Sequence, residues 1–322
     1  MARTIAGVLR GGTSSEYDLS LKTGANILSS LPEDRFDVRD IFIDKRGYWH
    51  QRGMSVDPAR ALSQIDVVLN GLHGGVGEDG TVQRILEQAG IPYTGSRPLA
   101  SGLSLNKIRA RDILKHAGLR IPQSVWFALD DGFPTLDMAR SVFSIFGPPY
   151  VVKPPSEGAS NGIIVADTIA QLPDAIADVL EGFGFALVEQ FIRGAQATVA
   201  VIEQYRDEDL YALPPALVAL PEGDRMLSRQ HNDNMSHHYV VPSPFDRGQK
   251  KMLTDAAKQA HRALGLSHFS RSDFIVTPNA VYLLETNALP GLYKGAAMPQ
   301  MLESVGSSVS EFLEHAVSLA RA

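Results

Sequence analysis

The sequence predicts a mixed α/β and α+β fold that opens with a doubly wound α/β unit. An apolar, β-branched run at residues 4–9 is followed by a Gly/Ser turn at 11–15 and a helical pattern from about residue 19, which is how such a unit begins. A second β-branched run at 65–69 is typical of a parallel strand buried on both faces, and it ends in a glycine-rich segment at 71–80. These segments together predict one small α/β module at the start of the chain.

The rest of the chain favours antiparallel hairpins between helices. Two hairpins are expected, one around a polar glycine loop at 154–162 and one around Pro278 and Asn279. Further short strands are expected at residues 91–95, 186–192, 198–203 and 211–220. Helices are expected at residues 82–88, 103–116, 170–180, 249–264 and 309–320. Residues 225–238 are polar and are expected to form a loop.

Composition excludes several classes of function. The 322-residue chain has no cysteine, so thiol catalysis, disulfides and cysteine-based zinc sites are excluded. Its net charge is −6 and it has no long run of Lys or Arg, so we expect no nucleic-acid partner. The short apolar stretch at residues 5–9 is too short for a signal peptide, and no segment is long enough for a membrane helix. We therefore expect a cytoplasmic protein without a membrane partner.

The hairpin near the C-terminus carries the clearest chemical pattern. Side chains two residues apart on a strand point the same way, so Asp273, Glu285 and Asn287 are expected on one face. Three oxygen-bearing side chains suit Mg²⁺, which takes its remaining ligands from phosphate and water. Arg271 would point the same way and could hold an oxyanion or a γ-phosphate. The alternative, on spacing alone, is a hairpin with a solvated polar face.

Three glycine-rich loops are weaker signals. Backbone N–H groups of the loop at 154–162 could wrap phosphate oxygens after Lys153, although the sequence is not a Walker A motif and a plain turn is the alternative. His73, in the loop at 71–80, is locally more typical of a structural histidine than of a ligand. Glu16 could recognise a substrate ammonium or simply favour a helix start. Each loop taken alone leaves both interpretations open.

Six motifs, taken in order, resemble the D-alanine–D-alanine ligase family of ATP-grasp enzymes over nearly the whole chain. They are GGTSSEYDLSL at 11–21, LHGGVGEDGTVQ at 72–83, IPYTGS at 91–96, NK at 106–107, VKP and GAS within 152–160, and SRSD with LETNALPG within 270–291. The resemblance implies an ATP-grasp fold with an N-terminal doubly wound α/β (preATP-grasp) domain. The implied domains are a substrate domain at 1–96, ATP-grasp subdomain A with the phosphate loop at 97–188, and subdomain B with the metal site at 189–322. A homodimer is also implied.

The resemblance assigns the nucleotide and metal ligands. Lys107 and Lys153 would contact the ATP phosphates. The adenine would lie at the hinge between the ATP-grasp halves, lined by Glu189, Gln190, Phe191 and Ile192. Gln196 stands where the family has a glutamate near the ribose. Two Mg²⁺ ions, with Mn²⁺ as an alternative, would be held by Asp273, Glu285 and Asn287.

The resemblance also assigns substrate and catalytic residues. Glu16 would bind the ammonium of the first amino acid, and His73 would lie near its carboxylate. Arg271 and the N–H of Gly291 would stabilise a tetrahedral oxyanion, and Ser160 would belong to the catalytic set. The implied reaction converts a carboxylate into an acyl phosphate, which an amine then attacks. Because acyl phosphates hydrolyse, loops 154–162 and 225–238 are expected to act as lids.

The sequence departs from the family on the substrate side. The family's loop with Tyr-Asp-Tyr and Lys-Tyr is absent, and His231 stands at its lysine by an ungapped count. Ala159 and Ala296 replace two serines, the second of which would hold the carboxylate of the second substrate. Losing such a donor costs about 1–3 kcal/mol unless Lys294, Arg229 or His231 takes over. A ligase with a shifted acceptor is therefore our hypothesis.

Three alternatives stay open. The first is an orthodox D-alanine–D-alanine ligase of cell-wall synthesis, which Ala159, Ala296 and the missing Lys-Tyr disfavour. The second is a catalytically silent ATP-binding relative, although such a protein has little need of Arg271. The third is a Rossmann oxidoreductase, which the absence of a G-x-G-x-x-G motif disfavours.

Overall fold

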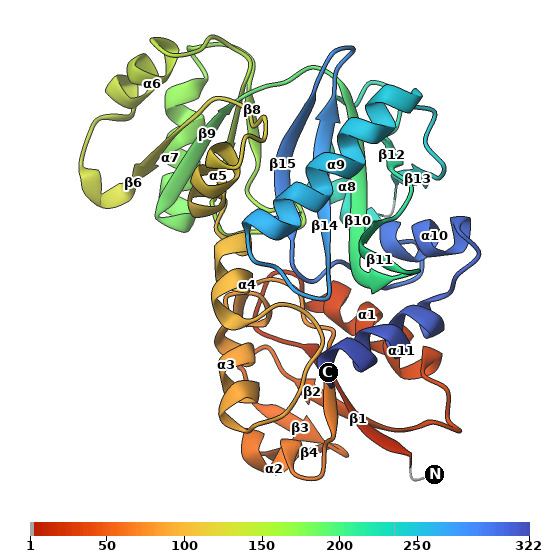
Figure 1. Ribbon diagram of the computed structural model, residues 1–322. Coiled ribbons are helices and arrows are strands. Elements are labelled where there is room, and N and C mark those ends of the chain that lie inside the picture. Colours follow the sequence, from red (N-terminus) through yellow and green to blue (C-terminus); the bar gives the residue numbers. More distant parts are fainter. Residues whose placement is uncertain (1–2, 235) are drawn as a thin grey trace.

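The computed structural model describes residues 3–234 and 236–322, so Met235, within the expected lid, and residues 1–2, within the expected first domain, lie outside the described residues. Three β-sheets follow one another along the chain (Figure 1). The second sheet has an apolar core of its own, whereas the first and third sheets share one apolar cluster in addition to their separate ones. The mixed α/β and α+β fold predicted from the sequence is confirmed.

The first sheet has the strand order β4-β3-β2-β1-β5. Its strands are β1 (Thr4–Gly11), β2 (Phe36–Ile43), β3 (Trp49–Gln51), β4 (Met54–Val56) and β5 (Val67–Asn70). β1 pairs in parallel with both β2 and β5, as a doubly wound unit requires. The accompanying helices are α1 (Tyr17–Ser30), α2 (Pro58–Leu62) and α3 (Thr81–Gln88), with a short 3₁₀ turn at Gly75–Gly77. The strand expected at residues 91–95 is reduced to a single bridge from Tyr93 to Val68.

The second sheet is small and antiparallel, with the order β6-β9-β7-β8. Its strands are β6 (Ser124–Ala128), β7 (Tyr150–Lys153), β8 (Ile164–Ala166) and β9 (Phe185–Gln190). The helices α6 (Thr135–Phe143) and α7 (Leu172–Phe183) pack together and bury its core. The β7–β8 hairpin encloses the glycine loop at 154–162, as the sequence predicts.

The third sheet has the order β13-β12-β10-β14-β15, with β11 also pairing with β10. Its strands are β10 (Ala195–Tyr205), β11 (Glu208–Ala212), β12 (Ala216–Ala219), β13 (His238–Val240), β14 (Phe269–Val276) and β15 (Val281–Asn287). Helix α9 (Arg247–Ala263) packs across β10, β14 and β15 and buries the apolar face of the sheet. The opposite face of the β14–β15 hairpin is left for the polar side chains.

Two expected elements are wrong in detail. The single helix expected at residues 103–116 is two helices, α4 (Pro98–Leu105) and α5 (Lys107–His116), because Asn106 adopts an extended conformation and its side chain accepts a hydrogen bond from Arg109 N at 3.1 Å. The break makes Lys107 the first residue of α5. The loop expected at 225–238 contains a short helix, α8 (Arg229–Asn234).

Helix α10 (Ala297–Ser304) packs against β10 of the third sheet, and the last helix, α11 (Val309–Ala320), returns to α1 and β5 of the first module (Figure 1). Phe312 and Leu313 of α11 share a core with Ala6 of β1 and Ile27 of α1. The expected domain of residues 189–322 thus contributes to the core of the first module, and the division into three domains stays a prediction. No helix in the described parts of the chain has the length and apolar character needed to cross a membrane.

Candidate active site

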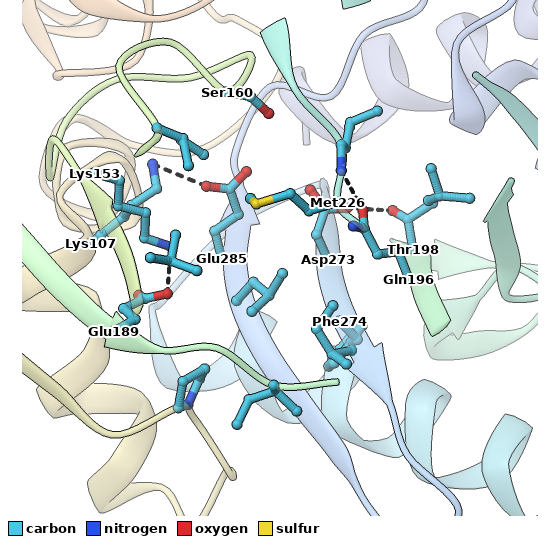
Figure 2. Close-up of a pocket in the computed structure, with 18 of the residues that line it drawn as sticks. Lys107, Lys153, Ser160, Glu189, Gln196, Thr198, Met226, Asp273, Phe274 and Glu285 are labelled. Atoms are coloured by element: carbon cyan, nitrogen blue, oxygen red, sulfur yellow. Dashed lines mark hydrogen bonds and ion pairs between the residues drawn. The ribbon is translucent and has the colours of Figure 1, made fainter. Parts of the chain in front are cut away.

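A cleft lies between the small sheet and the β14–β15 hairpin (Figure 2). It is continuous with a second pocket that faces the first module, because Ser160, Tyr239 and Arg271 line both. The first part contains all the residues assigned to ATP, which are Lys107, Lys153, Glu189, Gln190, Phe191, Ile192 and Gln196. The second part contains Glu16, His73, Asn287 and Gly291, and Asp273 and Glu285 line both parts.

Two buried lysines approach the cleft from different elements. Lys107 Nζ, at the start of α5, lies 3.0 Å from Glu285 Oε2 and donates to the carbonyl of Glu157 at 2.7 Å. Lys153 Nζ, at the end of β7, lies 2.9 Å from Glu189 Oε2. The other oxygen of Glu189 bonds to Arg111, so this carboxylate is held between two cations. The arrangement fixes both ammonium groups where phosphate charge would be neutralised.

The electrostatics of Glu285 and the lysines follow from burial and pairing. Burial alone would raise the pKa of Glu285, but Lys107 and Lys153 outweigh it and lower that pKa to about 2. Burial lowers the pKa of Lys153, whereas for Lys107 the attraction of Glu285 overcomes burial and raises the pKa. Glu285 is therefore a carboxylate at any physiological pH.

Strand register gathers the polar side chains of the hairpin. Asp273 lies opposite Glu285, and Arg271 lies opposite Asn287. Asp273 accepts hydrogen bonds from Arg271 Nε at 3.0 Å and Nη2 at 2.7 Å, from Asn287 Nδ2 at 3.1 Å and from Thr198 Oγ1 at 2.6 Å. The ladder shifts register between Asp273 and Phe274, and the shift lets Glu285 and its neighbour Leu284 both line the cleft.

The donor set fits Mg²⁺. Within the described residues, no cluster of three or more His, Cys, Asp or Glu side chains could hold a metal ion by itself. The cleft instead offers two carboxylates, Asp273 and Glu285, and the carboxamide of Asn287. Mg²⁺ is usually held by one or two carboxylates together with substrate phosphates and water, so such an incomplete set is appropriate beside a nucleotide site.

The two expected lids contact each other. Asn161 belongs to the phosphate loop (residues 154–162), and its side-chain N–H donates to the carboxylate of Glu157 in the same loop. The side-chain oxygen of Asn161 accepts a hydrogen bond from Arg229 of the lid segment (residues 225–238). Arg225 of the lid segment forms a bidentate ion pair with Asp167, at 2.8 and 3.0 Å. Its guanidinium also lies 5.8 Å from the ring centroid of Phe191, over the nucleotide part of the cleft.

The first module approaches the phosphate loop through Glu16. A Cβ atom built at Gly158 would lie 2.1 Å from Glu16 Oε1, so a larger residue there would have to displace the Glu16 carboxylate. Burial, reinforced by Glu78 and Glu285, raises the pKa of Glu16 to about 8, and burial raises that of Glu78 to about 7. A bound ammonium group would supply the positive charge that this pair of acids lacks.

His73 is already fully hydrogen-bonded. Its Nε2 lies 2.7 Å from Thr23 Oγ1, and its Nδ1 lies 3.1 Å from the carbonyl of Leu289. Burial lowers the pKa of His73 to about 4, so the ring is neutral near pH 7. The side chain lines the second pocket, but both of its nitrogens bond to the protein and not toward a substrate carboxylate.

Two residues assigned to the substrate are not among the described residues that line the cleft. His231 bonds to Ser228 through Nδ1 and to Asp224 through Nε2, at 2.8 Å, and so stabilises the lid segment internally. Lys294 is exposed beside the second pocket.

Sequence reasoning missed several residues of the site. Tyr239, Tyr293 and Leu227 line the second pocket. No local motif marks these residues. Tyr239, for example, reaches the pocket only because β13 pairs with β12. Glu78 also lines this pocket, and its carboxylate accepts a hydrogen bond from Gly74 N at 2.9 Å.

The chain matches known proteins along its whole length. The family model described as D-ala D-ala ligase C-terminus matches residues 113–318, and the model described as D-ala D-ala ligase N-terminus matches residues 50–96. A D-alanine–D-alanine ligase of Desulforudis audaxviator is 35% identical over 100% of this chain and 99% of its own. The chain belongs to the D-alanine–D-alanine ligase family. A relative of the same description from Geotalea uraniireducens is 33% identical over 98% of this chain and 94% of its own.

Solved structures of the D-alanine–D-alanine ligase family share the fold. The VanG D-Ala:D-Ser ligase of Enterococcus faecalis has a TM-score of 0.85 and 27% identity, covering 99% of this chain and 100% of its own. The D-alanine–D-alanine ligase of Bacillus anthracis, solved with ATP, has a TM-score of 0.80 and 25% identity, covering 99% of this chain and 97% of its own. The ATP-grasp fold implied by the sequence is confirmed. The family is ATP-dependent, uses Mg²⁺ and acts on small molecules, and this chain is an ATP-dependent ligase that forms C–N bonds.

Proposed function

We propose that the protein joins the carboxylate of an amino acid to an amine other than that of D-alanine, through an acyl phosphate. A carboxylate oxygen of the first substrate attacks the γ-phosphorus of ATP, and the bond from that phosphorus to ADP breaks. The amine nitrogen of the acceptor then attacks the acyl carbon, the bond from carbon to phosphate oxygen breaks, and the amine proton is lost. Both steps take place in the continuous cleft between the small sheet and the β14–β15 hairpin.

Side chains that line the cleft support each step. Lys107 and Lys153 would neutralise the transferring phosphoryl group, and Mg²⁺ held by Asp273, Glu285 and Asn287 would supply further positive charge there. Arg271 and the N–H of Gly291 would stabilise the oxyanion of the second step. Glu16 would bind the ammonium of the first amino acid, and Ser160 lies in both parts of the cleft where the acyl group passes.

The residues at the acceptor end of the cleft support a shifted acceptor. Ala296, which is 3% exposed, precedes α10 as its N-cap without a side-chain hydrogen bond, and Ala159 lines the second pocket. Arg271 is the only Lys or Arg among the described residues that line this pocket, and Asp273 already binds it with two bonds. The carboxyl groups of Glu16 and of the buried Glu78 face the same space. A carboxylate on the acceptor would therefore lack the partners that a buried anion needs.

The orthodox activity is the second candidate. The two relatives named above are both D-alanine–D-alanine ligases, whereas the VanG structure is a D-Ala:D-Ser ligase. Incubation with ATP, Mg²⁺, and D-alanine paired with each member of a panel of D- and L-amino acids and simple amines separates the two. Phosphate release and product masses should identify an acceptor that is used faster than D-alanine. Formation of D-alanyl-D-alanine alone, at a brisk rate, would establish the orthodox activity instead.

A homodimer remains a prediction.

Restoring the missing hydroxyl should restore D-alanine as an acceptor. In Ala296→Ser we expect kcat/KM for D-alanine as acceptor to rise about tenfold, since a hydrogen bond to a charged group contributes about 1.5–3 kcal/mol. Serine also suits the N-cap position, so the variant should fold. Ala170→Ser, the same change at an exposed position outside the cleft, is the matched control and should leave kcat/KM unchanged. An unchanged kcat/KM in Ala296→Ser would remove the hydroxyl from the explanation.

A further inference from the structure

The turn that carries Gly291 is held by the first module and not only by its own sheet. Leu289 and Leu292 flank this turn, and three polar side chains of the first module bond to them. His73 bonds to the carbonyl of Leu289, Thr23 accepts from the N–H of Leu292, and Asn26 donates to the carbonyl of Leu292. We call residues 289–292 the oxyanion turn. We propose that His73, linked through Thr23, is a positioning residue that fixes the oxyanion turn, and that it is not a ligand of a substrate carboxylate.

Hydrogen-bond chemistry determines the direction of every bond in this link. The carbonyl oxygen of Leu289 only accepts, so Nδ1 of His73 carries the proton. In the neutral ring Nε2 then accepts, and the Thr23 hydroxyl donates to it at 2.7 Å. The same hydroxyl oxygen accepts from Leu292 N at 3.3 Å. The link therefore joins one end of the turn to the other through a single tautomer of His73.

Burial makes the link rigid. His73 is 5% exposed and Thr23 is 1% exposed, so water does not compete for these bonds. Removing one member leaves a buried donor or acceptor unsatisfied, which is costly enough for the turn to move. On its other side the turn is confined by Tyr293, whose Cε1 would lie 2.7 Å from a Cβ atom built at Gly291. The N–H of Gly291 is thus held from two sides.

The consequence concerns the second chemical step alone. An oxyanion donor is effective only when it is fixed in advance at the position where charge develops. His73 and the oxyanion turn come from different modules, so docking of the modules completes this half of the site, whereas Lys107, Lys153 and Glu285 do not depend on it. This inference rests on the proposed function, because it assumes that Gly291 meets the oxyanion.

A nuclear magnetic resonance experiment tests the link without any substrate. In the full chain labelled with ¹⁵N-histidine, the signal of His73, assigned by its loss in His73→Asn, should show protonated Nδ1 and unprotonated Nε2 from pH 6 to pH 8. In Thr23→Val the ¹⁵N shift of Nε2 should change, because its donor is gone. A His73 that titrates near its ordinary pKa of about 6.5, or that carries its proton on Nε2, would overturn the inference.

A kinetic experiment tests what the link does. Thr23 is not among the described residues lining the cleft, so Thr23→Val removes the hydroxyl without touching a substrate. The first step is followed by positional isotope exchange in [γ-¹⁸O₄]ATP, using the amino acid that gives the fastest exchange in the wild type. The second step is followed with hydroxylamine as the acceptor, since this small nucleophile does not need the acceptor pocket.

The expected result is a split between the two steps. Isotope exchange should stay within about twofold of wild type, while hydroxamate formation falls by about 10- to 100-fold, the range for a misplaced oxyanion donor. Thr23→Ser keeps the hydroxyl and should restore the rate. Equal losses in both steps, or no loss in hydroxamate formation, would overturn the inference. A failed proposed function would appear differently, as absent exchange or a D-alanine-only acceptor profile in the wild type.

Discussion

Replacing Glu285 by glutamine is expected to lower ATP-dependent amide formation by about a thousandfold, equivalent to about 4 kcal/mol of barrier. Glutamine keeps the shape of the side chain but removes its negative charge. Lys107 and Lys153 stabilise that charge and lower the pKa of Glu285 to about 2. The loss leaves one carboxylate, Asp273, for the metal and frees Lys107 from its partner at 3.0 Å. Both phosphoryl transfer and the amide that depends on it should fall.

Coupled detection of ADP at saturating ATP, Mg²⁺ and substrates measures this effect. Glu208→Gln is the matched control, because Glu208 pairs at 2.9 Å with Lys258 and neither residue is among the described residues that line the cleft. That variant should retain full activity, since exposed pairs contribute little. Full activity in Glu285→Gln would show that this carboxylate does not take part in nucleotide cleavage.

Replacing Arg271 by lysine is expected to lower the rate of amide formation by about 100- to 1000-fold, the typical loss of an oxyanion donor. The guanidinium binds Asp273 through Nε and Nη2, a fork that an ammonium group cannot reproduce. Lysine therefore keeps the charge but loses both the fork that holds Asp273 and the remaining guanidinium N–H that the proposed mechanism assigns to the oxyanion. The Arg271 side chain is only 21% exposed, so little water can compensate for the lost bonds.

Product formation measured by mass spectrometry over time checks this expectation. Arg262→Lys provides the control, because Arg262 also pairs with an aspartate, Asp209, but on the exposed surface. The control should keep its rate within about twofold, because an exposed pair contributes about 0–1 kcal/mol. If Arg271→Lys matched the control, Arg271 would not stabilise the oxyanion.

The period of a β-strand made much of the site predictable. Asp273, Glu285 and Asn287 were expected on one face of a hairpin because their spacing is even, and the register places Asp273 opposite Glu285. Lys153 was predictable because it directly precedes a glycine loop in a hairpin. The position of Lys107 as the first residue of a helix was missed, because the break at Asn106 depends on a single side-chain cap.

Other parts of the site depend on contacts between distant segments, which local patterns do not reveal. The role of Glu189 as a partner of Lys153 and Arg111 needs three elements to meet. Tyr239 reaches the cleft only because the strand after the lid segment joins the large sheet. An ungapped count of residues places His231 at the position of the family's substrate lysine. In the structure the lid segment contains a short helix, and the His231 side chain bonds to Asp224.

Transfer of ¹⁸O from a carboxylate to phosphate tests the central claim, an acyl phosphate formed in this cleft, most directly. The wild type would be incubated with ATP, Mg²⁺ and a mixture of amino acids labelled with ¹⁸O in their carboxylates, and the released phosphate would be analysed by mass spectrometry. The mechanism predicts one ¹⁸O atom in each phosphate that accompanies a new amide, because the oxygen of the attacking carboxylate leaves with the phosphoryl group. Amide formation that releases only unlabelled phosphate would contradict it.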